Sequence, residues 1–378
     1  MAGPQAGRLA AIDVTRGLML VANIASPAWL SAPLWWGHAP WVGVHGSDLI
    51  FPVFVTLTGT GLALAYRRGV TWPPTLRRVF VLVLVGLLYN AYHQFLDDGA
   101  LSLGTLRWSG VLQLYAVLVL VMALVRTAIG RFERWWVWGV LALLVAAAHT
   151  GALALAAAGC SGGQLSPECN PSALLDPRWL GGGAHMYGAG LRGHDPEGVV
   201  SMAGALVSVL GGAALARLLA DSAAREAGAV VARMTLLAAV FGVASVTAAS
   251  FVPPMKRLWT APFSLGVLAG VTVVITLAYL AVDRGIAARG SAGQEPRAAL
   301  VLWPLLALGR NSLLVYFGSM TLTATLRTLP RDGQPIAQVI AEHVQMGSTG
   351  PLGFVLASVA LWVLIAMLLD RAGIYLRP

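Results

Sequence analysis

The chain has 378 residues, of which 57% are hydrophobic and only 11% are charged. This composition excludes an ordinary soluble domain and predicts an integral membrane protein. The formal net charge of +9 is accounted for by arginines at the inner membrane surface, so it does not indicate nucleic-acid binding.

Ten apolar stretches are long enough to cross a hydrocarbon core of about 30 Å as helices, and none shows the alternating pattern of a membrane barrel. We therefore predict an all-α membrane bundle that forms one domain over residues 1–378, in contact with membrane lipid. The predicted spans are 10–30, 47–66, 77–94, 109–126, 135–157, 198–219, 231–251, 259–281, 304–326 and 352–370. With both termini in the cytoplasm, most lysines and arginines lie inside, as the positive-inside rule requires.

Three polar side chains interrupt the first span, namely Asp13, Arg16 and Asn23. At 3.6 residues per turn, Arg16 and Asn23 lie nearly on one line about 10 Å apart, so we expect a polar stripe that faces protein. Asp13 and Arg16 either form an ion pair that only orients the helix or take part in binding. Asn23 lies deeper, which favours a functional or interhelical hydrogen bond.

Residues 38–54 read HAPWVGVHGSDLIFPVF and place His38, His45 and Asp48 at a membrane edge. Asp48 opens the second span, where the positive end of the helix dipole stabilises a carboxylate. It either orients a histidine for proton transfer or only caps the helix. Two histidines without a clear third ligand do not predict a metal site.

The longest predicted extracytoplasmic loop covers residues 158–197 and is rich in glycine, proline and serine. Its aromatic and titratable residues favour a structured lid over the outer face. The only two cysteines of the chain, Cys160 and Cys169, both lie in this loop. In an oxidising compartment we expect them to form a disulfide.

Two later segments carry further polar groups. Lys256 and Trp259 lie in a short outer turn, FVPPMKRLWT. Arg310 and Asn311 follow Pro304 near the inner surface, where Arg310 either neutralises a phosphate or extends to the membrane interface. The sequence has no Walker loop, no dinucleotide-binding glycine pattern and no HExxH motif.

Several short motifs then occur in a fixed order between Asp13 and Tyr316. They are NxxxP, HxxWxG followed by DLxFPxF, GVLQ, DPEG, PxxKxLW and GxNSLxVY. In this order they resemble the family of heparan-α-glucosaminide N-acetyltransferase, a lysosomal transmembrane acetyltransferase, and its bacterial relatives. Members of that family pass an acetyl group from cytoplasmic acetyl-CoA to a glucosamine amine across the membrane.

The resemblance implies a role for individual residues. His38 matches the active-site histidine, as general base or acyl carrier, and Asn23 and Asp48 match its catalytic partners. We expect acetyl-CoA to be bound by Arg16, Gln113, Arg310 and Asn311, and the acceptor by His45, Asp195, Glu197, Lys256 and Trp259. Leu114 and Met255 depart from the family pattern, which leaves the acceptor open as an amino sugar or another extracytoplasmic glycan.

The resulting hypothesis is an acetyl-CoA-dependent N- or O-acetyltransferase in the inner membrane of a bacterium, without a metal and compatible with a homodimer. The alternatives are a proton-coupled secondary transporter and a membrane scaffold without catalysis. A proton relay places ionisable groups through several helices at mid-membrane depth, whereas here they gather in one outer pocket and one inner entrance. This distribution favours acyl transfer.

Overall fold

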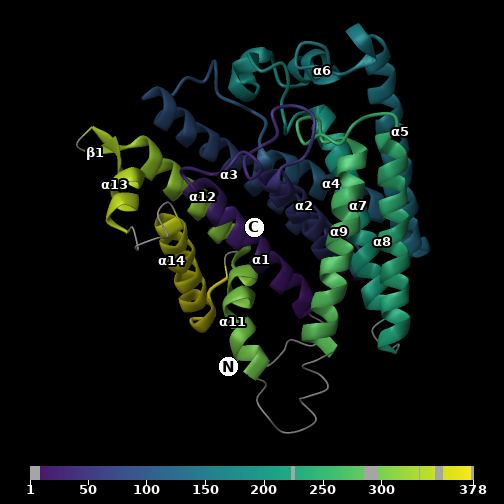
Figure 1. Cartoon of the computed structure of the whole chain (residues 1–378). Helices are drawn as coiled ribbons and strands as arrows, with labels where there is room; N and C mark the ends of the chain where they lie inside the picture. The colour runs from purple at the N-terminus through teal and green to yellow at the C-terminus, as the bar shows by residue number, and fades with distance from the viewer. Residues whose placement is uncertain (1–8, 223–225, 285–296, 332, 345–351, 376–378) are drawn as a thin grey trace. The chain divides into compact units, whose positions relative to one another are not determined.

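A computed structural model describes residues 9–222, 226–284, 297–331, 333–344 and 352–375 (Figure 1). Its helices are α1 (Ala10–Ala28), α2 (Ile50–Ala65), α3 (Trp72–Asp98), α4 (Val111–Ile129), α5 (Trp135–Ala158), α6 (Pro171–Trp179), α7 (Val199–Ser222), α8 (Ala227–Ala249), α9 (Ala261–Ala278), α11 (Arg297–Arg310), α12 (Ser312–Thr328), α13 (Ile336–His343) and α14 (Leu352–Arg371). The strands of the described residues are β1 (Pro330–Arg331) and β2 (Gln334–Pro335), which pair antiparallel. The predicted all-α, polytopic class is confirmed.

Among the described residues, eight helices are long and apolar enough to cross a membrane, or nine if one bent pair counts as a single span. Helix α1 is not among them, because the polar side chains of its stripe lower its hydropathy. The bent pair consists of Val301–Arg310 and Ser312–Thr328, at an angle of 82°. The span predicted over 304–326 is therefore broken by a sharp bend.

The physical reason for this break lies at Asn311. Its backbone has φ −107° and ψ 27°, outside the helical region, and α12 starts immediately after it. Just before it, Gly309 is so close to α1 that a Cβ atom there would lie 2.0 Å from the carbonyl oxygen of Asp13. The polar residues 310–312 interrupt the apolar pattern here, but the size of the bend follows only from the packing.

The chain forms two compact units. The first, here called the His38 unit, covers residues 38–272, and the second, here called the terminal unit, combines residues 1–37 with 273–377. The boundary after residue 272 falls inside α9. Each unit therefore has its own packing.

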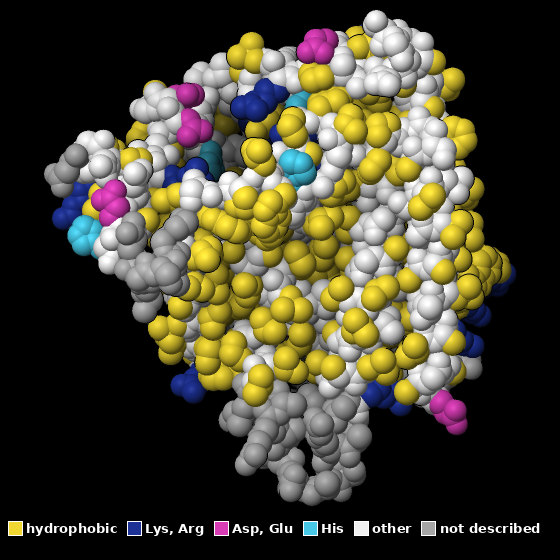
Figure 2. Space-filling view, viewed as in Figure 1, with side chains coloured by type: hydrophobic (Ala, Val, Ile, Leu, Met, Phe, Trp, Pro, Cys, Tyr) yellow, Lys and Arg dark blue, Asp and Glu magenta, His cyan; other side chains and the backbone are white. Residues whose placement is uncertain are grey.

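Helix α7 is the central helix of the His38 unit, and α2 and α5 pack along it. Glycines allow the backbones of α2 and α7 to touch: a Cβ at Gly59 would lie 2.0 Å from the carbonyl oxygen of Val209, and one at Gly212 would lie 2.1 Å from that of Thr56. Small residues at such contacts are typical of helix packing in membranes. On the outside, hydrophobic side chains cover much of α8 (Figure 2).

In the terminal unit, α1 packs against α11, α12 and α14. A Cβ at Gly17 would lie 2.2 Å from the carbonyl oxygen of Leu305, so α1 and α11 also meet backbone to backbone. The N-terminus of α1 is capped by Asp283, which accepts hydrogen bonds from the N–H groups of Ala10 (2.9 Å) and Ala11 (3.0 Å). An acidic side chain at this position satisfies free N–H groups and the helix dipole together.

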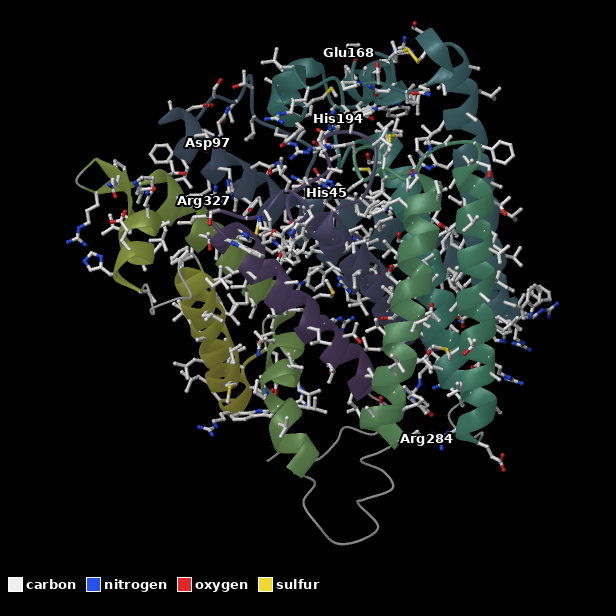
Figure 3. All side chains as sticks on the ribbon, in the orientation of Figure 1. His45, Asp97, Glu168, His194, Arg284 and Arg327 are labelled. Carbon is white, nitrogen blue, oxygen red and sulfur yellow. A yellow bond between two sulfur atoms is a disulfide. The ribbon has the colours of Figure 1, made fainter. Side chains whose placement is uncertain are left out.

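The segment 158–197, which was predicted to be a structured lid and is called the lid below, contains α6 and several short helical turns. Cys160 and Cys169 form a disulfide, and Asn170 caps α6 by accepting a hydrogen bond from the N–H of Ala173 (3.1 Å). The Asn170 amide also donates to the carbonyl of Gly193 (3.0 Å), which ties the two ends of this segment together. Figure 3 shows Glu168, His194 and His45 near the end of the His38 unit that carries α6.

Candidate functional site

The central feature of the candidate site is a hydrogen bond between His38 and Asp48. The Nδ1 atom of His38 lies 2.7 Å from Oδ1 of Asp48. The Asp48 side chain is 1% exposed, whereas that of His38 is 51% exposed. Because a carboxylate only accepts hydrogen bonds, Nδ1 carries a proton, and in the Nδ1-protonated tautomer the free electron pair lies on Nε2. The buried Asp48 carboxylate thus holds Nδ1 and leaves Nε2 of the half-exposed ring open.

Local sequence explains how Asp48 reaches this position. It lies in a short helical turn, Gly46–Leu49, that leads directly into α2. Its second oxygen, Oδ2, accepts hydrogen bonds from the N–H groups of Ala39 (3.0 Å) and His45 (2.9 Å). Asp48 therefore caps the helix and orients the histidine at the same time, which unites the two alternatives drawn from the sequence.

The loop that carries His38 is anchored to two distant segments of the same unit. The N–H of Gly43 donates to the carbonyl of Pro254 (3.1 Å), and the indole N–H of Trp41 donates to the carbonyl of Leu165 (2.8 Å). The Trp41 ring also meets His194 edge to face, with 5.1 Å between ring centroids. These contacts fix the loop between the lid and the turn at 252–260.

A second cluster joins the lid to the rest of the His38 unit through Arg107. Its Nη2 atom lies 2.6 Å from Oδ1 of Asp195 and 2.7 Å from Oε2 of Glu197. The hydroxyl of Ser109 donates to Asp195 (2.5 Å), and Lys256 lies 3.8 Å from Glu197. The structure thus brings three predicted acceptor residues together around an arginine that the motifs did not select.

The electrostatics of this cluster keep Asp195 ionised. Burial alone would raise the pKa of this fully buried carboxyl, yet Arg107 and hydrogen bonds from Ser109 and the Glu197 N–H hold it below its usual value. The two carboxylates raise the pKa of the Arg107 guanidinium in turn. Burial lowers the pKa of nearby His194, which favours its neutral form. The cluster is a charged scaffold with little free capacity for hydrogen bonds.

The only sequence signal for Arg107 was its place in a predicted outer segment, where arginines are few in this chain. Nothing local links it to Asp195, because the two residues are 88 positions apart. Nothing local links Ser109 to Asp195 either, because these two residues are 86 positions apart.

Asp176 on α6 is a further buried carboxyl, with 0% exposure. It accepts hydrogen bonds from the hydroxyl of Ser172 and from the N–H of Val200 (3.3 Å), at the start of α7. Burial nevertheless raises its pKa from 3.8 to about 6. A carboxyl with a raised pKa stabilises the folded state at acidic pH, and this stabilisation is lost as pH rises from 3.8 through about 6.

We therefore expect Asp176→Asn to remove a pH-dependent loss of stability. Between pH 4.5 and pH 7.5, wild type should lose about 2 kcal/mol relative to the variant. Unfolding of both proteins in detergent at these pH values measures the difference. Parallel pH curves for the two proteins would contradict the expectation.

Other predicted residues of the His38 unit are buried with unsatisfied polar atoms. Within the described structure, neither amide atom of Gln113 has a hydrogen-bond partner, and the same is true of the indole N–H of Trp259. Gly86 leaves the room for Gln113, since a Cβ there would lie 2.5 Å from its amide oxygen. The Trp259 ring packs edge to face on Phe51, at 5.0 Å. Buried groups of this kind call for a ligand or ordered water.

The remaining predicted residues lie in the terminal unit. Arg16 forms an ion pair with Asp13 (3.4 Å), and the Asn23 amide donates to the hydroxyl of Ser319 (3.4 Å). Arg310 pairs with Asp370 (3.1 Å).

Asn311 is fully buried, and its side-chain oxygen has no partner in the described part of the chain. The two predicted phosphate-binding arginines, Arg16 and Arg310, thus lie on α1 and α11, two helices in backbone contact, and each is engaged by an aspartate.

The fold and the site define a polytopic helical membrane protein with a histidine–aspartate pair at the entry to a helix. Comparison with known sequences shows what the chain is similar to. The family described as heparan-alpha-glucosaminide N-acetyltransferase, catalytic, matches residues 8–161, which include Asn23, His38, Asp48 and Gln113. These matches and those below confirm the family resemblance drawn from the motifs.

Two curated relatives align with almost the whole chain. Heparan-alpha-glucosaminide N-acetyltransferase of Homo sapiens is 24% identical over 425 residues, which cover 97% of this chain and 59% of the human protein. The Mus musculus protein of the same name is 23% identical over 426 residues, covering 98% of this chain and 60% of the relative. The chain thus spans about 60% of the length of these relatives.

Proposed function

We propose that this protein is a transmembrane acyltransferase that moves an acetyl group from cytoplasmic acetyl-CoA to an amino sugar or another glycan acceptor on the extracytoplasmic side. The observation that carries the proposal is the His38–Asp48 pair, with its free Nε2 atom. The names of the curated relatives support the same reaction class.

The pair supports general-base catalysis. The acceptor amine or hydroxyl attacks the thioester carbonyl, and Nε2 of His38 takes the proton that the nucleophile loses. When the carbon–sulfur bond breaks, the imidazolium returns this proton to the leaving thiolate. Asp48 stabilises the imidazolium in between, because its carboxylate faces Nδ1 at 2.7 Å. The same open Nε2 also suits His38 as a transient acyl carrier.

Residues assigned to the donor fit a molecule that carries amides and phosphates. The unsatisfied amide of Gln113 suits the amide groups of the pantetheine arm, and the free oxygen of Asn311 is a second buried acceptor. Arg16 and Arg310 suit the phosphates, in exchange for part of their contact with Asp13 and Asp370. We assign Asn23 to the thioester oxygen as it gains charge, a contribution of about 3 kcal/mol for one such donor.

We propose that the residues on the acceptor side have two different roles. Asp195 and Glu197 are held by Arg107, so they shape the wall of the pocket. Lys256 is bound less tightly, at 3.8 Å from Glu197, and we assign it to the sugar together with His45 and Trp259. The enclosing membrane is the inner membrane of a bacterium.

The test uses purified protein, acetyl-CoA labelled in the acetyl group and a panel of amino sugars. We expect acceptor-dependent release of CoA together with labelled sugar. Proton-driven uptake of solute into proteoliposomes without any acyl transfer would support the transporter alternative. If CoA is released neither to an acceptor nor to water, and His38→Ala behaves as wild type, the acyltransferase proposal is wrong.

A further inference from the structure

The turn at residues 252–260 holds the loop that carries His38. One link is the hydrogen bond from the N–H of Gly43 to the carbonyl of Pro254 (3.1 Å), beside a β-bridge between Gly43 and Met255. The other is a side-chain contact: Nε of Arg257 donates to the carbonyl of Ala39 at 3.2 Å, across 218 positions of sequence. Arg257 thus reaches the residue next to His38.

Both backbone polar groups of Ala39 are thereby fixed. Its N–H donates to Oδ2 of Asp48 (3.0 Å), and its carbonyl accepts from Arg257. Ala39 itself is 2% exposed. The orientation of the His38 ring depends on this peptide, because two anchored groups on Ala39 restrict the backbone torsions that carry the ring to Asp48.

The turn is a firm support for Arg257. The hydroxyl of Thr260 accepts from the N–H of Met255 (2.9 Å) and donates to the carbonyl of Pro253 (3.0 Å), which closes the turn internally. Trp259 is fully buried with φ +48°, a conformation that persists only when the surroundings hold it. A Cβ at Gly204 on α7 would lie 1.8 Å from the carbonyl oxygen of Trp259, so the backbone of α7 is in direct contact with the turn.

Arg257 differs in its partners from its neighbours in the site. Arg107 and Lys256 each pair with a carboxylate, whereas among the described residues Arg257 forms no ion pair. A half-buried guanidinium bound to one carbonyl adds little as a general stabilising charge. Its structural effect is concentrated on the peptide that follows His38.

We propose that Arg257 is a positioning residue that keeps His38 in contact with Asp48. The proposal rests on the proposed acyl transfer, in which His38 is the base or the acyl carrier. Arg257 acts through the Ala39 carbonyl and touches neither donor nor acceptor. Its loss allows the His38 ring to leave Asp48 while the lid cluster around Arg107 stays intact.

The first test is a double-mutant cycle on acyl transfer. We expect Arg257→Gln to lower kcat about 10- to 100-fold with little change in KM, because misplacement by about 1 Å has effects of this size. In an Asp48→Asn background the same change should have an effect below about threefold, since the contact it protects is already lost. Arg178→Gln, an exposed arginine on α6, is the matched control and should be silent.

The second test does not depend on activity. In 15N spectra of histidine-labelled protein, with the His38 signal assigned through His38→Gln, wild type should show only the Nδ1-protonated ring. Arg257→Gln should add the Nε2-protonated form. A wild-type tautomer in Arg257→Gln, or an equal loss of kcat in both Asp48 backgrounds, would overturn the positioning role. Absence of acyl transfer in wild type would overturn the proposed function alone.

Discussion

Replacement of His38 by alanine is expected to reduce kcat/KM for acyl transfer by about 10²- to 10⁴-fold, the range that one general acid–base group supplies. The side chain is half-exposed with a free Nε2, so its removal leaves the fold largely untouched while the proton acceptor disappears. Initial rates of CoA release with the amino-sugar acceptor measure the effect. Unfolding temperatures of the two proteins should agree closely.

Two further variants separate the roles within the pair. Asp48→Asn keeps the size of the side chain but offers an amide where Nδ1–H needs a carboxylate, so we expect a loss of about 10²-fold or more. His45→Ala leaves intact the backbone N–H through which His45 reaches Asp48, and its effect should be much smaller. If His45→Ala were inactive and His38→Ala active, the base would have been assigned to the wrong histidine.

Replacement of Arg107 by leucine is expected to lower the free energy of unfolding by about 3–5 kcal/mol, the range found when one partner of a buried ion pair is removed. The loss is large because Asp195 is completely buried and Glu197 is 95% buried, and both would lose their shared cation. Unfolding in detergent measures the free energy. Limited proteolysis within 158–197 reports whether the lid has come loose.

The pH dependence gives this prediction a second criterion. In wild type the pKa of Asp195 lies below its usual value, so its stabilising effect is present at neutral pH and is lost as the solution becomes acidic. The deficit of Arg107→Leu should therefore shrink toward acidic pH. Arg192→Gln is the matched control, since Arg192 only stacks on the ring of Tyr187, at 5.3 Å. A loss in Arg107→Leu no larger than in this control would contradict the scaffold role.

The sequence was sufficient for the helical class and for the His38–Asp48 pair, and the reason is locality. The two residues are ten positions apart in sequence. The turn that starts the helix places the Asp48 carboxylate next to the preceding loop, which carries His38. Hydropathy detects long apolar helices because each membrane-spanning helix must cover the thickness of the hydrocarbon core with apolar side chains. These signals need no knowledge of tertiary contacts.

The features that sequence reasoning missed all depend on long-range packing. Arg107 meets Glu197 across 90 positions, and Arg257 meets Ala39 across 218. The break at Asn311 accompanies the close packing of Gly309 against α1, whose residues are about 300 positions away in sequence. Composition and motif spacing cannot distinguish an arginine that will be buried between two carboxylates from one that faces solvent, because the partners are supplied by the fold.

The make-up of the terminal unit has a consequence for biosynthesis. Helix α1 is translated before residues 38–272, whereas its partners α11, α12 and α14 are translated after them. Until then Asp13, Arg16 and Asn23 lack the helices that shield them, and isolated polar groups are costly in lipid. Stable integration of α1 is thus expected only after α11, α12 and α14 have been translated.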